Sequence, residues 1–301
     1  MRIVSLLPGA TDMLVALGGA DLLVGVSHAC SSTQGAAALP RVTTCSIAAD
    51  GASGAIDATV REIAAAGQPM YALDERLIRS LGPDLIVTQA LCDVCAVSES
   101  DVRALAARLS PAPAVVALGG STIDGVFADL AALATATGLG SESDELTAGL
   151  RRRMRTVHDR LNAAEAPRPR VAVIEWTDPI FAGGHWVPEQ VKRAGGVDVL
   201  ATPGGHSVVA SADQVRAANP EIVIVAPCGW GVERAATEAM QLIDAHPWLA
   251  AVDVWAIDAH SLTSRPGPRI VDGIETMARI FAPTLFPAPN PALARRVTRP
   301  A

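Results

Sequence analysis

The sequence predicts an α/β protein made of two parallel-sheet α/β lobes joined by one long connector helix, with a ligand cleft between the lobes. Three observations support this fold class. Strands alternate with helices along most of the chain, which is typical of parallel β-α-β units. A strand motif occurs twice, at 83–95 and 219–228, and each copy combines a helix stop, an acidic residue, an apolar strand and a trailing cysteine. A long amphipathic segment separates the two copies.

The domain boundaries follow from length and from this repeat. The chain has 301 residues, of which 50% are hydrophobic, so it is long enough to bury two cores. We predict an N-terminal α/β lobe at 1–140, a connector helix at 141–168, a C-terminal α/β lobe at 169–282 and a flexible tail at 283–301. The tail is predicted from its prolines and from the arginines near its end.

In the first lobe the pattern predicts strands at 2–6, 22–26, 41–44, 85–87 and 114–118. Pro8-Gly9 turns the first strand into a helix that Thr11 or Asp12 can cap. Further helices are predicted at 56–66, 74–81, 101–109 and from 121 to about 138. Gly82-Pro83 ends the helix before the first copy of the strand motif, because proline cannot continue a helix.

The segment at 141–164 gives the clearest helical pattern in the chain. Its apolar residues fall on one narrow stripe: Leu146, Leu150, Met154, Val157 and Leu161. At 1.5 Å per residue the helix would be about 36 Å long, roughly one domain diameter. This favours a rigid connector between two lobes, and a peripheral helix of one large domain is the alternative.

In the second lobe we expect strands at 170–175, 221–225 and 252–257, and helices at 188–194, 211–218 and 269–281. The segment 176–186 is interpreted as a loop.

Composition narrows the classes of function. The net charge is −7 and no basic run precedes the tail, which argues against a nucleic-acid partner. No apolar stretch is long enough to span a bilayer, and the N-terminus lacks the pattern of an export signal. Five cysteines, an odd number, fit a reducing compartment better than a disulfide framework. These features predict a cytoplasmic protein as written, or a periplasmic or cell-surface one if a leader was removed.

The phosphate-binding, dinucleotide-binding and Gly-x-Ser-x-Gly motifs of common enzymes are missing, which favours binding over catalysis.

Candidate site residues come from the ends of the predicted strands. Ligands of parallel α/β sheets bind beyond the carboxyl ends of the strands. In the first half these positions hold Pro8, His28, Cys30, Cys45, Gln89, Cys92 and Cys95. In the second half they hold Trp176, Phe181, His185, Trp186, Cys228, Trp230, His260 and Arg265.

The cysteines allow a metal site. Cys92 and Cys95 have C-x-x-C spacing, so both sulfurs could reach one metal or form a redox pair. Cys30 and Cys228, with His28 or His185, could complete a tetrahedral set for zinc or an iron–sulfur cluster. The alternative for each is a small buried hydrophobic residue, and for Cys45 this alternative is favoured.

The aromatic residues and Arg265 suggest a flat ligand. Trp176, Trp186 and Trp230 lie in predicted loops, where core packing explains them less well, and exposed indoles in a cleft suit a large flat ligand. Arg265, in the stiff Ser264–Arg269 turn, could hydrogen-bond a ligand amide or carboxylate, and a helix-capping ion pair is the equal alternative.

The combined motifs resemble a known family. Arg2-Ile-Val-Ser-Leu-Leu-Pro-Gly-Ala-Thr, Val24-Gly25-Val26-Ser27, Pro83-Asp84-Leu85-Ile86, Gly195-Gly196 and Arg265-Pro-Gly-Pro-Arg269 are similar to the helical-backbone (class III) solute-binding proteins. This family includes the iron-siderophore and cobalamin receptors of ABC importers. The resemblance covers about residues 2–283 and is closest to the cobalamin-binding branch, in particular to a leaderless, cysteine-containing subgroup.

The resemblance implies a non-enzymatic protein that binds a corrinoid, such as cobalamin, or a related metal chelate between its lobes. Its partner would be an ABC permease. By motif position Pro8, Cys45, Gln89, Phe181, Trp230 and Arg265 would lie near the ligand. The chain departs from exported members by its lack of a leader, and by Cys45 and Leu91-Cys92 where those members carry aromatic residues. Two alternatives stay open: a thiolate metal or iron–sulfur site built from the cysteines, and a cysteine-dependent enzyme.

Overall fold

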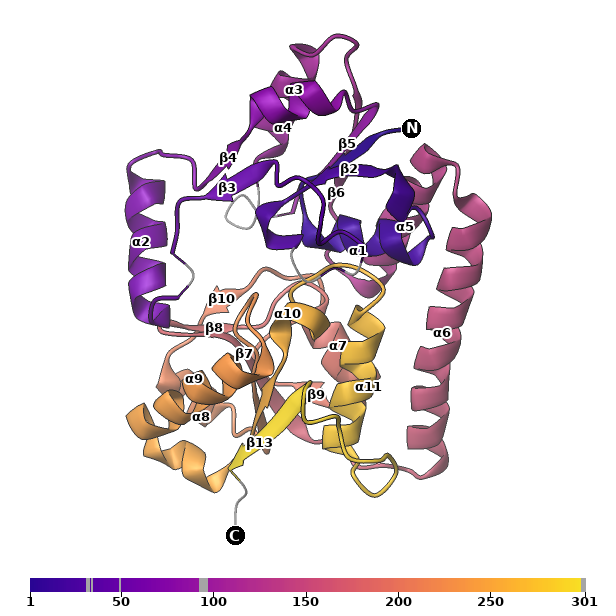
Figure 1. Cartoon of the computed structure of the whole chain (residues 1–301). Coiled ribbons are helices and arrows are strands. Elements are labelled where there is room, and N and C mark those ends of the chain that lie inside the picture. The colour runs from indigo at the N-terminus through magenta and orange to yellow at the C-terminus, as the bar shows by residue number, and fades with distance from the viewer. Residues whose placement is uncertain (31–32, 34, 49, 92–96, 299–301) are drawn as a thin grey trace. The chain divides into compact units, whose positions relative to one another are not determined.

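The computed structural model describes residues 1–30, 33, 35–48, 50–91 and 97–298 (Figure 1). The chain divides into two compact units. Unit 1 consists of Met1–Gly120, Asp124–Ala148 and Pro266–Pro268, and unit 2 consists of Ser121–Ile123, Gly149–Arg265 and Arg269–Ala301. Each unit has its own sheet, as the two-lobed α/β fold class predicts.

The main sheet of unit 1 is parallel throughout. Its strand order is β2 (Leu23–Val26), β1 (Ile3–Ser5), β5 (Leu85–Gln89) and β6 (Ala114–Leu118). The helices of this part are α1 (Pro8–Ala16), α2 (Ser53–Ala65), α3 (Glu75–Leu81), α4 (Glu99–Ala107) and α5 (Ile123–Thr137). Short 3-10 turns occupy Ala20–Leu22 and His28–Cys30. A separate antiparallel pair, β3 (Thr43–Cys45) and β4 (Tyr71–Leu73), was predicted only for its first strand.

The core of unit 1 lies between the sheet and its covering helices. Val4 and Ile86 from the sheet pack with Ile78 of α3 and with Val102 and Leu105 of α4, and all five are fully buried. Burying such a side chain contributes about 1.5–3 kcal/mol each. This core therefore comes from the apolar strands that the sequence identifies and from one face of α3 and of α4.

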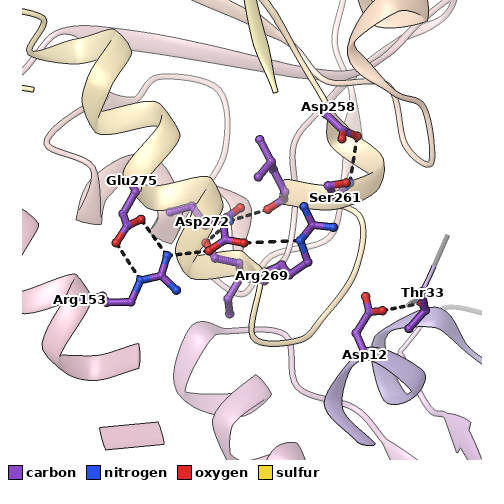
Figure 2. Close-up of polar contacts among 11 residues, drawn as sticks. Asp12, Thr33, Arg153, Asp258, Ser261, Arg269, Asp272 and Glu275 are labelled. Carbon is purple, nitrogen blue, oxygen red and sulfur yellow. Dashed lines mark hydrogen bonds and ion pairs between the residues drawn. The ribbon is translucent and has the colours of Figure 1, made fainter. Parts of the chain in front are cut away.

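The predicted cap of α1 is wrong. The helix begins at Pro8, directly after Leu7, and its N-cap position makes no side-chain hydrogen bond. Proline is tolerated at the first helical position because the N–H it lacks has no partner there. Thr11 Oγ1 instead donates to Ser5 Oγ at 2.8 Å, and Asp12 Oδ1 accepts a hydrogen bond from Thr33 Oγ1 at 2.6 Å (Figure 2).

Unit 2 contains a mixed sheet, which corrects the expected all-parallel one. Its strand order is β10 (Val208–Val209), β8 (Ile180–Ala182), β7 (Arg170–Thr177), β11 (Ile222–Val225), β12 (Asp253–Ile257) and β13 (Ala294–Thr298), and β9 (Val197–Asp198) pairs with β7. β7, β11 and β12 are mutually parallel, whereas β8, β10 and β13 run antiparallel to their neighbours. The helices are α7 (Val187–Arg193), α8 (Ala212–Ala217), α9 (Val232–Ala245), α10 (Ala259–Leu262) and α11 (Ile270–Phe281), with a 3-10 turn at Pro247–Ala251.

Two segments of unit 2 differ from the expectation. The predicted loop 176–186 holds the end of β7 and all of β8. The predicted flexible tail contains β13, which hydrogen-bonds to β12 along Val254–Ile257. Arg296 helps to hold β13 against β12, because its guanidinium binds both carboxylate oxygens of Asp253 at 2.6 Å. The tail is therefore a strand of the sheet between Ala294 and Thr298.

The strand and the acidic residue of the repeated motif are confirmed in both units, whereas Cys92 and Cys95 of the first copy lie outside the described residues. β5 and β11 are fully buried, and each lies beside the first strand of its unit. In unit 1 the N–H of Arg2 donates to Asp84 Oδ2 at 2.7 Å, and the N–H of Asp84 donates to the carbonyl of Arg2 at 2.8 Å. In unit 2 Arg170 and Glu221 make the same reciprocal pair, both bonds at 2.8 Å.

The turn before each copy of the motif is also alike. Gly82 ends α3 with a φ of +52°, and Asn219 follows α8 with a φ of +46°, each just before a proline. Glycine and asparagine are the residues that enter this left-handed region at least cost. The acidic residue of the motif thus pairs two neighbouring strands and is not free for chemistry.

The long helix α6 spans Gly140–Ala163 and is unbroken in Figure 1, close to the predicted 141–164. Its apolar stripe is buried as predicted, including Leu150, Met154 and Val157. Within the described residues, no helix is both long and apolar enough to cross a membrane.

An ion-pair network fixes the second half of α6 to α11 within unit 2 (Figure 2). Arg153 donates to both carboxylate oxygens of Glu275, at 2.9 and 2.8 Å, and to Asp272 Oδ1 at 2.6 Å. The pKa of Arg153 lies above its ordinary value, first because of the hydrogen bond to Glu275. Asp272 also faces Arg269, with 3.5 Å between Asp272 Oδ2 and the Arg269 Nε.

Replacing Arg153 by methionine is expected to lower the free energy of unfolding by about 1 kcal/mol, the scale of a partly exposed ion-pair network. Methionine keeps the apolar stem but removes three hydrogen bonds and leaves two carboxylates close together. Urea unfolding at low and high salt checks this. Arg155→Met, at an exposed position of the same helix, is the control and should change stability by much less. Equal effects of the two variants would contradict a role for the network.

Candidate functional site

The carboxyl ends of β7 and β11 in unit 2 bring three predicted residues together. Trp176 lies near the end of β7 and opposes Phe181 of β8, so the two side chains share one face of the sheet. Trp230 follows β11, and its ring centroid is 4.8 Å from that of Trp176. Trp230 is only 9% exposed, whereas Trp176 is half-buried. The prediction that these residues form one group is therefore supported for Trp176, Phe181 and Trp230.

Arg234, in the first turns of α9, completes this group. It was not among the site residues predicted from the sequence. Its guanidinium carbon lies 3.4 Å from the Trp230 ring centroid, a close cation–π contact. The helix α9 was itself not predicted, so nothing placed position 234 near position 230. We call Trp176, Phe181, Trp230 and Arg234 the Trp–Arg group. It combines apolar rings with a fixed positive charge.

Arg265 and His260 form a second group beyond the end of β12. Arg265 is 6% exposed, and its Nη2 lies 2.5 Å from His260 Nε2. Because arginine can only donate, this imidazole nitrogen must be the acceptor. The backbone ties the pair to the Trp–Arg group, since the N–H of His260 donates to the carbonyl of Trp230 at 3.0 Å. The N–H of Gly229 donates to Ser264 Oγ at 2.9 Å and makes a second link between the same two loops.

Trp186 is a buried residue that stabilises a loop of unit 2. It is 5% exposed, and its Nε1 donates to the carbonyl of Thr263 at 2.9 Å. Nearby, Gln190 of α7 donates from Nε2 to the carbonyls of Leu262 and Ile270. Trp186 and Gln190 thus hold the segment that carries His260 and Arg265. A direct contact of Trp186 with a ligand stays a prediction.

His185 is held in an uncommon backbone conformation, with a φ of +55°. Its N–H donates to the carbonyl of Gly205 at 2.6 Å, and its carbonyl accepts from the N–H of Gly204 at 2.8 Å. His206, which sequence reasoning missed, lies with its ring centroid 5.5 Å from that of His185. The pKa of His185 is below its ordinary value because burial disfavours the charged ring, and His206 adds to this effect. His185 is therefore neutral near pH 7.

Unit 1 gathers polar side chains at the carboxyl ends of β1 and β2. His28 Nδ1 lies 2.8 Å from Thr43 Oγ1, and its ring stacks on Tyr71 at 5.7 Å between centroids. Burial lowers the pKa of His28. Cys45 is half-buried and opposes Tyr71 in the β3–β4 pair. Tyr71 is the residue of this edge that sequence reasoning missed, because β4 was not predicted.

The remaining predicted residues of unit 1 lie at the same edge. Pro8 begins α1, and Gln89 is the last residue of β5 and is 9% exposed. Their roles, like that of Cys45, stay predictions.

The predicted thiolate metal site stays a prediction, because the structure describes only two of its four cysteines. Cys30 is fully buried in unit 1, where its Sγ lies 3.2 Å from Thr11 Oγ1, and Cys228 is exposed in unit 2. Cys92 and Cys95 lie outside the described residues. In the described part of the chain no group of three or more histidine, cysteine, aspartate or glutamate side chains could hold a metal ion.

Comparison with known proteins gives the family. Residues 3–253 match a family model described as periplasmic binding protein. No match is found among curated proteins.

Several solved structures share the fold. A periplasmic heme-binding protein from Pseudomonas aeruginosa is 20% identical, with a TM-score of 0.73 over 100% of this chain and 99% of that chain. The periplasmic vitamin B12 binding protein BtuF of Vibrio cholerae is 23% identical, with a TM-score of 0.65 over 93% of this chain and 96% of that one. The heme-binding protein RhuT from Roseiflexus sp. RS-1 is 19% identical, with a TM-score of 0.68 over 95% and 99%.

At these identities the likeness to solved structures establishes the fold, and the family model establishes the family. It agrees with the resemblance to helical-backbone solute-binding proteins. Because the family model covers most of the sequence, the chain belongs to the periplasmic binding protein family.

Proposed function

We propose that the chain is a non-enzymatic solute-binding protein whose ligand is a corrinoid or a related flat metal chelate, delivered to an ABC permease. The single observation that carries this proposal is the Trp–Arg group of unit 2. Trp176 offers a half-buried indole, and Phe181 and Trp230 lie beside it. Aromatic faces of this kind bind conjugated ring systems at little entropic cost.

The positive charges of two arginines in unit 2 suit the polar side groups at the edge of such a ligand. Arg234 lies over Trp230, and Arg265 is tied to the same loop through His260 and Trp230. Guanidinium groups donate to amide or carboxylate oxygens in a fixed geometry. Amides are the side groups of corrinoids and carboxylates those of hemes. Structural neighbours named as vitamin B12 and heme binding proteins support the same ligand class.

The test is a titration of the purified protein with cyanocobalamin and, separately, with hemin. Binding of at least one chelate is expected, with a shifted visible spectrum and a calorimetric heat at one ligand per chain. Neither a spectral shift nor a heat with either chelate would contradict the proposal.

Trp176→Ala is expected to weaken binding of the chelate about tenfold, which corresponds to about 1.4 kcal/mol. The loss arises because the variant removes the half-buried indole of the Trp–Arg group while β7 keeps its backbone pairing. Met240→Ala, which removes an apolar side chain 52% exposed on α9, is the control and should bind like the wild type. An unchanged affinity of Trp176→Ala would place the ligand elsewhere.

The two alternatives are tested with the same preparation. Stoichiometric zinc or iron in protein purified without oxygen, lost in Cys92→Ser and Cys95→Ser, would favour the thiolate or iron–sulfur site. Turnover abolished by Cys92→Ser would favour an enzyme.

A further inference from the structure

We propose that Val209 of β10 is a further ligand-contacting residue of unit 2. Together with Trp176 and Phe181 it forms a row of apolar side chains across three strands, and this row binds the flat face of a ring system. We call these three residues the apolar row. The inference deepens the proposed function and rests on it for the identity of the ligand, but the row itself can be tested without a chelate.

The strand pairing places the three side chains on one face of the sheet. Trp176 of β7 opposes Phe181 of β8, and Phe181 in turn opposes Val209 of β10. Directly opposed residues of antiparallel strands point to the same side of a sheet. Because neighbouring strands are about 4.8 Å apart, the row runs about 10 Å across the sheet. Trp230 continues it beyond Trp176, with 4.8 Å between the two ring centroids.

An irregularity in β7 turns Trp176 toward this row. Ile174 opposes Ala182 and Trp176 opposes Phe181, so one residue of β7 has no counterpart in β8. Such a bulge redirects the side chains that follow it. Ile174 packs with Ile180 in the core of unit 2, whereas Phe181 lies on the other face of β8. The bulge therefore moves an indole from the face of the core to the face of the apolar row.

The row becomes more open to solvent toward the edge of the sheet. Trp176 and Phe181 are half-buried, and Val209 is 60% exposed. β10 is the last strand on this side of the sheet and lies beside β8 in Figure 1. A single exposed valine is ordinary on a protein surface. One that continues a row of aromatic rings instead enlarges an apolar patch of the kind that marks a binding site.

The backbone around β10 is fixed on both sides, so Val209 has a defined place. After the strand, the N–H of Ala210 donates to the carbonyl of Ile180 at 2.9 Å. Before it, Gly184 allows a close approach, because a Cβ there would lie 2.4 Å from the backbone nitrogen of Ser207. A side chain that is ordered before the ligand arrives lowers the entropic cost of binding.

The positive charge of the Trp–Arg group lies at the other end of the row. The strand order β10, β8, β7, β11 puts Val209 on one side of β7, whereas Trp230 follows β11 on the other side. The Arg234 guanidinium lies over Trp230, with 3.4 Å between its carbon and the ring centroid. The surface therefore suits a flat ring system that has anionic or amide groups along one edge and an apolar opposite edge.

The first measurement uses anilinonaphthalene sulfonate, a dye with flat apolar rings and one anionic group, which fluoresces on apolar surfaces. Val209→Asp places a charge in the row and should weaken binding of the dye about tenfold. Val208→Asp is the matched control, because Val208 is 49% exposed in the same strand but opposes Ala182 on the other face. This control adds the same charge and should bind the dye like the wild type.

A gain of affinity separates a binding effect from a folding defect. Val209→Phe adds an aromatic ring to the row at a strand position, where aromatic residues are favoured, and should tighten binding of the dye about threefold. Val208→Phe should leave the affinity unchanged. The inference is overturned if the wild type does not bind the dye, or if the variants at Val209 bind it as those at Val208 do.

The same proteins are then titrated with cyanocobalamin and with hemin, which separates this inference from the proposed function. Val209→Asp should weaken the chelate that binds about tenfold, and Val208→Asp should not. If a chelate binds and Val209→Asp matches the wild type, the inference fails and the proposed function stands. If neither chelate binds while the dye distinguishes the two aspartate variants, the apolar row stands and the proposed function fails.

Discussion

Replacing Asp198 by asparagine is expected to raise the free energy of unfolding above pH 6 by about 1–3 kcal/mol and to leave it unchanged near pH 4. Asp198 ends β9 and lies within unit 2, where its Oδ1 accepts from the N–H groups of Leu200 and Ala201 at 2.9 Å. Its Oδ2 is buried and has no hydrogen-bond partner among the described residues. Burial raises the pKa of this carboxyl to about 6, against the opposing effect of those two hydrogen bonds.

The sign follows from proton binding. Between the ordinary pKa of 3.8 and about 6, the folded protein holds a proton on Asp198 that the unfolded chain has lost. The wild type is therefore stabilised by this group at low pH and loses that contribution as the pH rises through about 6. Asparagine is neutral throughout and keeps the Oδ1 acceptor, so the difference between the two proteins should open between pH 4 and pH 6.

Urea unfolding of both proteins at pH 4, 5, 6 and 7.5 measures this difference. Asp159→Asn, at an exposed position of α6, is the control and should follow the wild type within a few tenths of a kcal/mol. If the free energies of unfolding of Asp198→Asn and the wild type differ by the same amount at every pH, the carboxyl of Asp198 does not titrate in this range.

Replacing Gly273 by alanine is expected to destabilise the protein by about 2 kcal/mol, although alanine is the better helix former. A Cβ at this position of α11 would lie 2.5 Å from Gln190 Nε2 and 2.6 Å from the carbonyl oxygen of Leu262. The second contact is with backbone that Gln190 itself holds, so it cannot yield by a side-chain rotation. The variant also disturbs the segment that carries His260 and Arg265.

Gly149→Ala is the matched comparison, because it makes the same change inside another helix. Its Cβ would meet the Arg152 side chain at 3.8 Å, an ordinary contact, and propensity alone should stabilise α6 by up to about 1 kcal/mol. The midpoint temperature of thermal unfolding should therefore fall below that of the wild type for Gly273→Ala and rise above it for Gly149→Ala. Shifts of the same sign would mean that the close approach at Gly273 is relieved at little cost.

The parts of the fold that could be predicted are those with a strong local signal. β5 and β11 are short apolar runs between a helix stop and a change of composition, and α6 carries an uninterrupted apolar stripe. β4, β8 and β13 have no such signal, because each is short and depends on pairing with a distant strand. Arg296 illustrates this point, since its role in β13 follows only from the pairing that brings it to Asp253.

The candidate site was predictable as a set of residue types but not as a set of contacts. Trp176, Phe181 and Trp230 could be assigned to strand ends, and the structure groups them. Arg234 belongs to a helix with no distinguishing motif, and the His260–Arg265 contact depends on the short helix α10 that contains His260. Sequence spacing gives the order of such groups along the chain, whereas distances across loops come from packing.

The tripeptide Pro266–Pro268 has a consequence for how the molecule can be divided. It is embedded in the middle of unit 2 in sequence but belongs to unit 1, where the carbonyl oxygen of Pro266 would lie 2.4 Å from a Cβ on Gly9. A gene fragment that stops at Ala148 would therefore lack this piece of unit 1, and Gly9 of α1 would lose its contact with Pro266. A protease cut between Arg265 and Arg269 would instead leave α11 and β13 attached to unit 2 only by non-covalent contacts, namely the pairing of β13 with β12 and the ion pairs of Arg153 with α11. These contacts should keep the two pieces together, so the cleaved protein should still elute as one species.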